Sequence, residues 1–271
     1  MHTIREFTGV RPVPAWLIIG LYALLIAATL VIFDVVIPGQ WTRPIAAATG
    51  GLIHANFLVY AAELLVIGWL LRRFGGLRCQ DLGLHRQLIV PALAWTAFGW
   101  ATLQVGAVVE QGDPAIHGDW STRPLANIGE FVTGQLLANA LFEEIFYRAF
   151  LVSQLTLLFS RRLGWGWSLF WAAMISQVMF SVMHIPVRLH AGMEWDAISA
   201  SLISTWFTGM VFTGIYLLTG NVLIAVGLHA LHNRSPDLFE GCDHVIEQPM
   251  LLLFAAFALF RWWRHRRIRR T

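Results

Sequence analysis

Long apolar segments are the feature that most constrains how this chain can fold. A helix needs about 20 mostly apolar residues to cross the hydrocarbon core of a bilayer. Segments near that length, or somewhat shorter, lie at residues 15–36, 51–71, 88–109, 128–158, 164–185, 198–218, 221–233 and 249–262. They predict an all-α polytopic membrane protein with about eight transmembrane helices. Because the segments at 221–233 and 249–262 are short, a count of seven stays open.

The composition agrees with a membrane protein. The chain of 271 residues is 57% hydrophobic and only 13% charged, whereas a soluble domain usually has about 25% charged residues. Many of the 13 tryptophans lie near segment ends, as expected for the aromatic belts at the two membrane surfaces.

The arginines indicate an orientation. All 19 basic residues are arginines, and with eight spans 14 of them fall on one side of the membrane and four on the other. The positive-inside rule then places both termini in the cytoplasm, and we expect a multi-pass protein of the inner or plasma membrane of a bacterium. Six arginines at 261–270 are interpreted as an anchor to lipid headgroups, so no nucleic-acid partner is expected.

The stretch LFEEIFYRAF, residues 141–150, places three charges inside an apolar segment. Ionisable residues are costly in a bilayer and usually mark a functional site. Glu144 and Arg148 are four residues apart and can pair on one helix face, a pair that could equally well serve packing alone. Glu143 is rotated by about 100° from Glu144. If it is unpaired, it is a candidate general base.

Two later segments add polar residues at helical spacing. In MFSVMHIPVR (179–188), Phe180 and His184 are four apart, and in GNVLIAVGLHALHNR (220–234) His229 and Asn233 share a face. His232 lies outside that register. Taken singly, each histidine or amide could be an interfacial residue or a hydrogen-bonding contact between helices.

The spans that carry these residues alternate in direction. On the predicted topology, His184, His229 and Asn233 lie towards the non-cytoplasmic ends of their helices. Glu143 is about halfway along its span, so one water-filled cavity open to that side could bring all four together. The first three spans contribute only Asp34, near an end, and Glu63.

The three motifs, EExxxR, FxxxH and HxxxN in this order on successive spans, resemble the CPBP family (CAAX protease and bacteriocin-processing, or Abi) of intramembrane proteases, which includes the Rce1-type CAAX prenyl endopeptidases. The resemblance covers about residues 128–235, in spans four to seven. It implies that Glu143 and His184 activate a water and that His229 and Asn233 stabilise the oxyanion. By the same resemblance, the residues that orient the site or contact the substrate are Glu144, Arg148 and Phe180.

We therefore expect three regions: N-terminal helices and loops without a motif at 1–127, a protease core at 128–235, and a last helix with a basic tail at 236–271. The predicted activity is hydrolysis of a peptide bond in a peptide or membrane-anchored protein at the lipid bilayer. No cofactor is expected, although zinc held by Glu143, His184 and His229 remains the alternative. A non-catalytic scaffold that regulates a partner enzyme and a proton-coupled transporter are the competing hypotheses.

Overall fold

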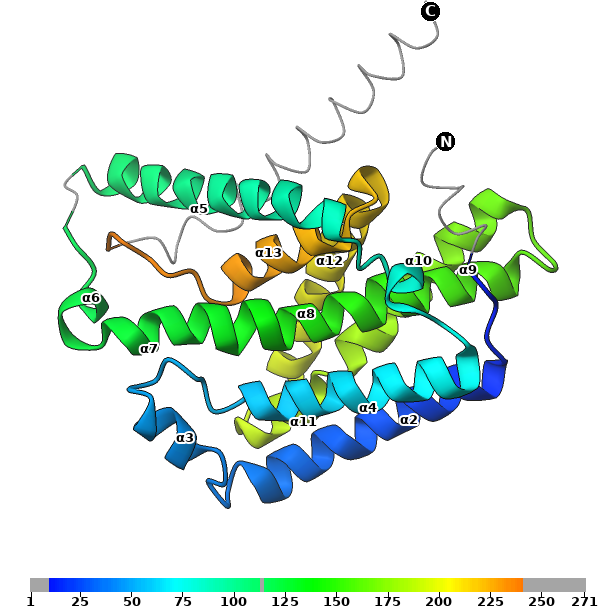
Figure 1. Ribbon diagram of the computed structural model, residues 1–271, viewed down its shortest axis with the longest axis horizontal. Coiled ribbons are helices and arrows are strands. Elements are labelled where there is room, and N and C mark those ends of the chain that lie inside the picture. The colour runs from blue at the N-terminus through cyan, green and yellow to red at the C-terminus, as the bar shows by residue number, and fades with distance from the viewer. Residues whose placement is uncertain (1–9, 113–114, 241–271) are drawn as a thin grey trace, which may run out of the picture.

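The computed structural model describes residues 10–112 and 115–240, and within them the chain is helical (Figure 1). In this part of the chain, the β pairing is limited to one antiparallel bridge between Ile116 and Phe239. The expected all-α class is confirmed. Four described helices are long and apolar enough to cross a membrane, namely Ala15–Val36, Cys79–Gln111, Trp165–His190 and Trp195–Thr219. A total of eight spans is not confirmed, and the segment expected at 249–262 lies outside the described residues.

Helices α2, α3 and α4 form one side of the bundle, and α5 lies on the opposite side (Figure 1). Helix α2 (Ala15–Val31) continues into a π-helical turn, η1 (Ile32–Val36). The short α3 (Arg43–Ala48) leads to α4 (Phe57–Gly75), which begins six residues later than the apolar pattern predicted. Two 3₁₀ turns, η2 (Cys79–Leu82) and η3 (Arg86–Leu88), precede α5 (Ile89–Gln111).

One long helix runs through the centre of the molecule (Figure 1). After the short α6 (Asp119–Thr122), it extends without interruption through α7 (Pro124–Gly129), η4 (Glu130–Asn139), α8 (Ala140–Glu143), η5 (Glu144–Val152) and α9 (Ser153–Phe159). Segments η4 and η5 have π-type hydrogen bonding, which is frequent at functional sites. Glu143 therefore lies at the end of a single α-helical turn between two π-helical segments. We call the whole helix from Pro124 to Phe159 the central helix.

The remaining helices complete the bundle. They are α10 (Trp165–Val182), α11 (Ile185–His190), α12 (Trp195–Thr219) and α13 (Val222–Asn233). Of these, α10 and α13 pack directly on the central helix. At Gly227, where α13 crosses α5, an added Cβ would lie only 1.7 Å from Thr96 Oγ1, so the close approach of these helices requires glycine. Every residue of η5 is buried.

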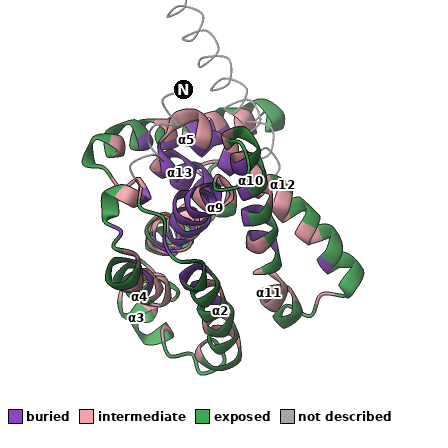
Figure 2. Ribbon diagram, turned by 90° about the vertical axis from the view of Figure 1, so that its right-hand side faces the viewer, coloured by how far each residue is buried: buried purple, intermediate pink, exposed green. Residues whose placement is uncertain are grey.

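Burial decreases from the centre of the bundle outwards (Figure 2). Large apolar side chains are exposed on the outer helices, among them Trp16 at 60%, Leu65 at 75% and Phe207 at 60%. An apolar exterior of this extent is expected where the solvent is lipid rather than water.

The N-terminal helices share a core with the segment that carries the motifs. Residues of α2 and α4 belong to the same hydrophobic cluster as residues of η5 and α10. Gln154 of α9 accepts a hydrogen bond from Val13 N (2.8 Å) and donates one to Arg11 O (3.1 Å). The Tyr22 hydroxyl donates to Met179 O at 2.9 Å. The region expected at 1–127 thus packs directly on the core expected at 128–235, and these boundaries stay a prediction.

Candidate active site

The expected pair between Glu144 and Arg148 is present at the centre of the bundle. Arg148 Nη1 lies 3.2 Å from Glu144 Oε1, and both side chains are fully buried. A buried ion pair is stable only when further contacts satisfy its remaining polar groups. The guanidinium lies over the Phe180 ring, 4.3 Å from its centroid, and donates a long hydrogen bond to Gly209 O at 3.4 Å. Phe180, the first residue of the second motif, therefore supports the arginine of the first motif.

His229 lies between the two glutamates. Its Nδ1 is 2.7 Å from Glu144 Oε1, and its Nε2 is 3.4 Å from Glu143 Oε2. Because an ionised carboxylate only accepts hydrogen bonds, Nδ1 carries a proton that it donates to Glu144. The ring stacks on Phe212 of α12 with centroids 4.6 Å apart. These contacts fix the orientation of His229 and place it beside Glu143.

Glu143 faces a cavity of about 330 Å³ among α2, α4, the central helix, α11 and the end of α13. His184 and Asn233 line the same cavity, so three of the four residues expected there are found together. His229 is not among the described residues that line it, because this ring is only 3% exposed and lies behind Glu143. The expectation that one cavity holds both imidazoles is corrected in this respect.

His184 and Asn233, which both line this cavity, differ in their hydrogen bonding. His184 follows α10, and its Nδ1 lies 2.9 Å from Phe180 O. A carbonyl can only accept, so Nδ1 carries the proton, and in the neutral ring Nε2 retains a lone pair. Asn233 ends α13 and donates through Nδ2 to Gln135 Oε1 at 3.0 Å. The cavity thus combines a carboxylate, a potential imidazole base and an amide donor.

Several residues of the site lie outside the three motifs. Gly209 allows Arg148 to approach α12, because a Cβ there would be 3.2 Å from Arg148 Nη2 and 2.5 Å from Gln177 Oε1. Phe212 and Gln135 had no recognisable signal in the sequence. Glu63 of α4 also lines the cavity. The sequence marked this residue, because it is an acid within an apolar segment.

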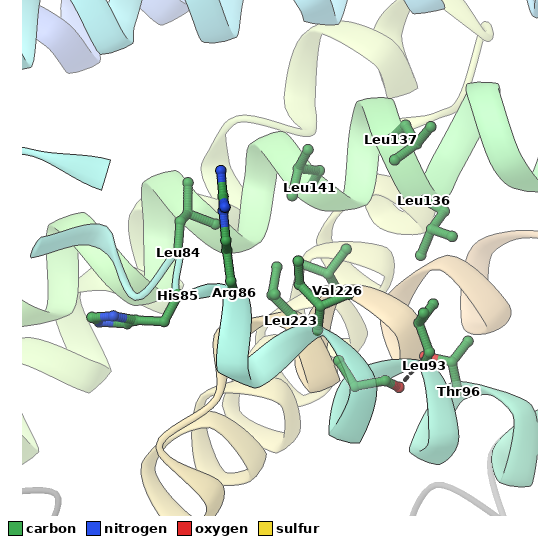
Figure 3. A pocket seen from close by; sticks show the side chains of 12 residues that line it. Leu84, His85, Arg86, Leu93, Thr96, Leu136, Leu137, Leu141, Leu223 and Val226 are labelled. Carbon is green, nitrogen blue, oxygen red and sulfur yellow. Dashed lines mark hydrogen bonds between the residues drawn. The ribbon is translucent and has the colours of Figure 1, made fainter. Parts of the chain in front are cut away.

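A second cavity, of about 340 Å³, lies between α5, the central helix and α13 (Figure 3). Leu136, Leu137 and Leu141 of the central helix and Leu223 and Val226 of α13 point into it, and His85 and Arg86 lie at one end (Figure 3). No acidic residue of the described chain lines it. Since Leu141 is two positions from Glu143, about 200° around the helix, the apolar cavity lies on another face of the central helix.

In residues 10–112 and 115–240, no three His, Cys, Asp or Glu side chains converge in a way that could hold a metal ion. Glu143, His184 and His229, the ligands of the zinc alternative, do not form such a group in this arrangement.

An all-helical bundle with apolar outer faces and membrane-length helices defines the class: this is an integral membrane protein. Residues 127–235 match the family model described as type II CAAX prenyl endopeptidase Rce1-like. This segment, about two fifths of the chain, is similar to the Rce1-like family, and it contains all three motifs. The resemblance expected over 128–235 is confirmed. No curated protein and no solved structure is significantly similar to the chain.

Proposed function

We propose that this protein is an intramembrane endopeptidase that hydrolyses a peptide bond in a membrane-associated protein or peptide. The observation that carries the proposal is that Glu143, His184 and Asn233, from three different helices of the Rce1-like segment, line one cavity. A serine or cysteine nucleophile is not required, because a carboxylate and an imidazole can activate water directly.

On this proposal, Glu143 is the general base. A water between Glu143 and His184 gives a proton to the Glu143 carboxylate as its oxygen attacks the scissile carbonyl carbon. His184 holds that water through the lone pair on Nε2. When the C–N bond breaks, the proton passes from Glu143 to the leaving amine, which restores the carboxylate. General acid–base steps of this kind contribute about 10²–10⁴-fold to rates.

Asn233 and His229 are assigned to stabilising the oxyanion and to positioning Glu143. The Asn233 amide lines the cavity and can turn from Gln135 to donate to the developing oxyanion. Such donors contribute about 2.7–4 kcal/mol in known hydrolases. The Nε2 of His229 lies 3.4 Å from Glu143 Oε2. Because Nδ1 donates to Glu144, Nε2 can donate to Glu143 only in the doubly protonated ring. In that form we assign His229 to positioning the Glu143 carboxylate, and a contact with the oxyanion requires movement of the Glu143 side chain. Glu144, Arg148 and Phe180 hold His229 in place.

The location of the cavity supports an outward-facing site. It is lined by residues from the end of α2 and η1 and from the start of α4, which the arginine distribution assigns to the non-cytoplasmic side. We propose a multi-pass protein of a bacterial inner or plasma membrane with both termini in the cytoplasm. Its substrates would then be secreted peptides or proteins anchored at the outer surface. Reporter fusions at residue 236 that report a cytoplasmic location would contradict this orientation.

The test begins with cells that produce either the active protein or the Glu143→Gln variant. Comparison of protein termini in their membrane and secreted fractions identifies substrates. With a peptide from such a substrate, purified Glu143→Gln and His184→Ala proteins should lose cleavage while eluting as folded protein, and the matched control Glu194→Gln, at an exposed position, should retain it. Full activity in either site variant would overturn the assignment. Cleavage that survives a strong chelator supports hydrolysis without zinc, and a folded wild type that cleaves nothing favours the scaffold hypothesis.

A further inference from the structure

Glu63 is an acid of the cavity wall that the proposed chemistry does not use. It lies on α4, outside the segment that matches the Rce1-like family, and it lines the same cavity as Glu143, His184 and Asn233. Its side chain is half-buried. No hydrogen bond or ion pair joins Glu63 to another of the residues described in the structure, although these include many arginines.

Each of the two neighbouring acids has a basic side chain within 3.4 Å, whereas none of the described residues forms an ion pair with Glu63. Glu144 contacts Arg148 and His229, and Glu143 contacts His229. A carboxylate inside a membrane protein is costly unless a cation or strong donors face it. Glu143 adds to the cost because the two carboxylates repel each other across the cavity. A counter-charge for Glu63 can come from outside the described residues, and the cavity is the space through which it can reach this carboxyl group.

The charge balance of the cavity favours a cationic ligand. Glu63 and Glu143 are two carboxylates, whereas Arg188 is the single arginine among the described lining residues. Arg188 is on α11, and no ion pair joins it to Glu63 in the described structure. A lysine or arginine side chain of a bound peptide fits this balance, because its long apolar stem can cross the apolar part of the wall and its charged end can meet the carboxylate.

We propose that Glu63 is a specificity-determining residue that binds a Lys or Arg side chain of the substrate close to the scissile bond. This inference rests on the proposed peptidase function. A sphere with the volume of the cavity is about 9 Å across, which corresponds to about three residues of extended chain. The cationic residue therefore lies within about three positions of the bond that is cleaved.

The first measurement uses a mixture of peptides of defined sequences, with cleavage sites read by mass spectrometry. The wild type should cleave sites enriched in Lys or Arg within three positions of the bond. Glu63→Gln, which keeps the shape of the side chain and removes its charge, should lose this enrichment and still cleave neutral sites. The matched control Asp34→Asn neutralises an exposed acid at the same end of the bundle that does not line the cavity, and it should behave as the wild type.

The second measurement needs no variant that could misfold. A peptide that the wild type cleaves with Lys near the bond is compared with the same peptide carrying norleucine at that position. We expect kcat/KM to fall about tenfold with norleucine, mainly through KM, and the ratio to approach one in Glu63→Gln. Cleavage by the wild type without preference for the cation, or a preference unchanged in Glu63→Gln, overturns this inference alone. Absence of cleavage of every peptide overturns the proposed function together with the inference.

Discussion

Two cavities of nearly equal volume, about 330 and 340 Å³, lie on different faces of the central helix. The lining of the first includes Glu63, Glu143, His184 and Asn233, whereas that of the second is mostly aliphatic and contains no acid among the described residues. Both occur in a protein whose outer surface faces lipid, so size and apolar lining do not distinguish a reaction site from a packing defect or a lipid contact. The difference lies in the buried charges, which persist in a membrane only where they are paired or used.

The largest effect should come from breaking the buried pair beside the polar cavity. Arg148→Met leaves Glu144 as a buried carboxylate that retains only His229, and removing one partner of a buried ion pair typically costs about 3–5 kcal/mol. We expect a marked loss of thermal stability in detergent or nanodiscs. The double variant Glu144→Gln/Arg148→Met removes both charges and should recover much of this loss. If the single variant is as stable as the wild type, the pair is not a structural element of the site.

A large effect on rate without an effect on stability should come from Asn233. Its side chain is exposed at the end of α13, so Asn233→Ala should fold normally. We expect kcat to fall about 10²–10³-fold, the loss seen when an oxyanion donor is removed. Asn139→Ala is the matched control, because Asn139 lines the same cavity and also bonds Gln135, at 3.3 Å. Equal losses in the two variants would show that Asn233 acts only through the shape of the cavity.

Helical spacing predicted which residues share one face of a helix, but it did not predict how the helices pack against one another. The pairing of Glu144 with Arg148 follows from a separation of four residues on one helix, and the structure contains it. The burial of His229 behind Glu143 does not follow from its motif. It depends on Phe212 of α12, whose ring stacks on the imidazole, and no local pattern marks that phenylalanine among the many in the chain.

Glu63 is the opposite case, because the sequence marked the residue but not its neighbours. The acid was visible in the sequence as a charge within an apolar segment, but its neighbours depend on how α4 packs against the central helix. That packing is set by apolar contacts spread over many residues, such as the tilted pair of Tyr60 and Phe142 rings. The length of the central helix was also underestimated, since it begins at Pro124, whose fixed φ suits a first helical position, rather than near residue 128.

A smaller effect is expected at the rim of the polar cavity, where Arg234 follows Asn233. Asp119 accepts hydrogen bonds from Arg123 at 2.8 Å and from Arg234 at 3.1 Å, and Arg234 also contacts Glu130 at 2.7 Å. The hydrogen bond from Arg123, with the nearby positive charges, lowers the pKa of Asp119. A lowered pKa stabilises the fold above the unfolded value of about 3.9, and this contribution is lost as the pH falls through the folded pKa.

The network can be measured by the stability difference between the wild type and Asp119→Asn. Partly exposed ion pairs contribute about 0.2–1 kcal/mol, so a small loss of stability is expected near pH 7. That difference in stability should shrink as the pH falls below about 4. The wild-type carboxylate is then protonated and, like the amide of the variant, carries no charge. A difference that stays constant down to pH 3 would contradict a contribution from the Asp119 charge.

The smallest effect is expected in the apolar cavity, and it tests the comparison most directly. Leu93→Trp fills part of this space from α5, and Val109→Trp is the matched control, because Val109 lies on the same helix, is 77% exposed and does not line the cavity. Both side chains are largely exposed, Leu93 at 56%, and substitutions at exposed positions usually change the free energy of unfolding by less than about 0.5 kcal/mol. We therefore expect kcat/KM on the substrate peptide to stay within about twofold of the wild type for both variants. A selective loss in Leu93→Trp would mean that the substrate occupies both faces of the central helix, since the two variants differ in whether the added ring enters the cavity.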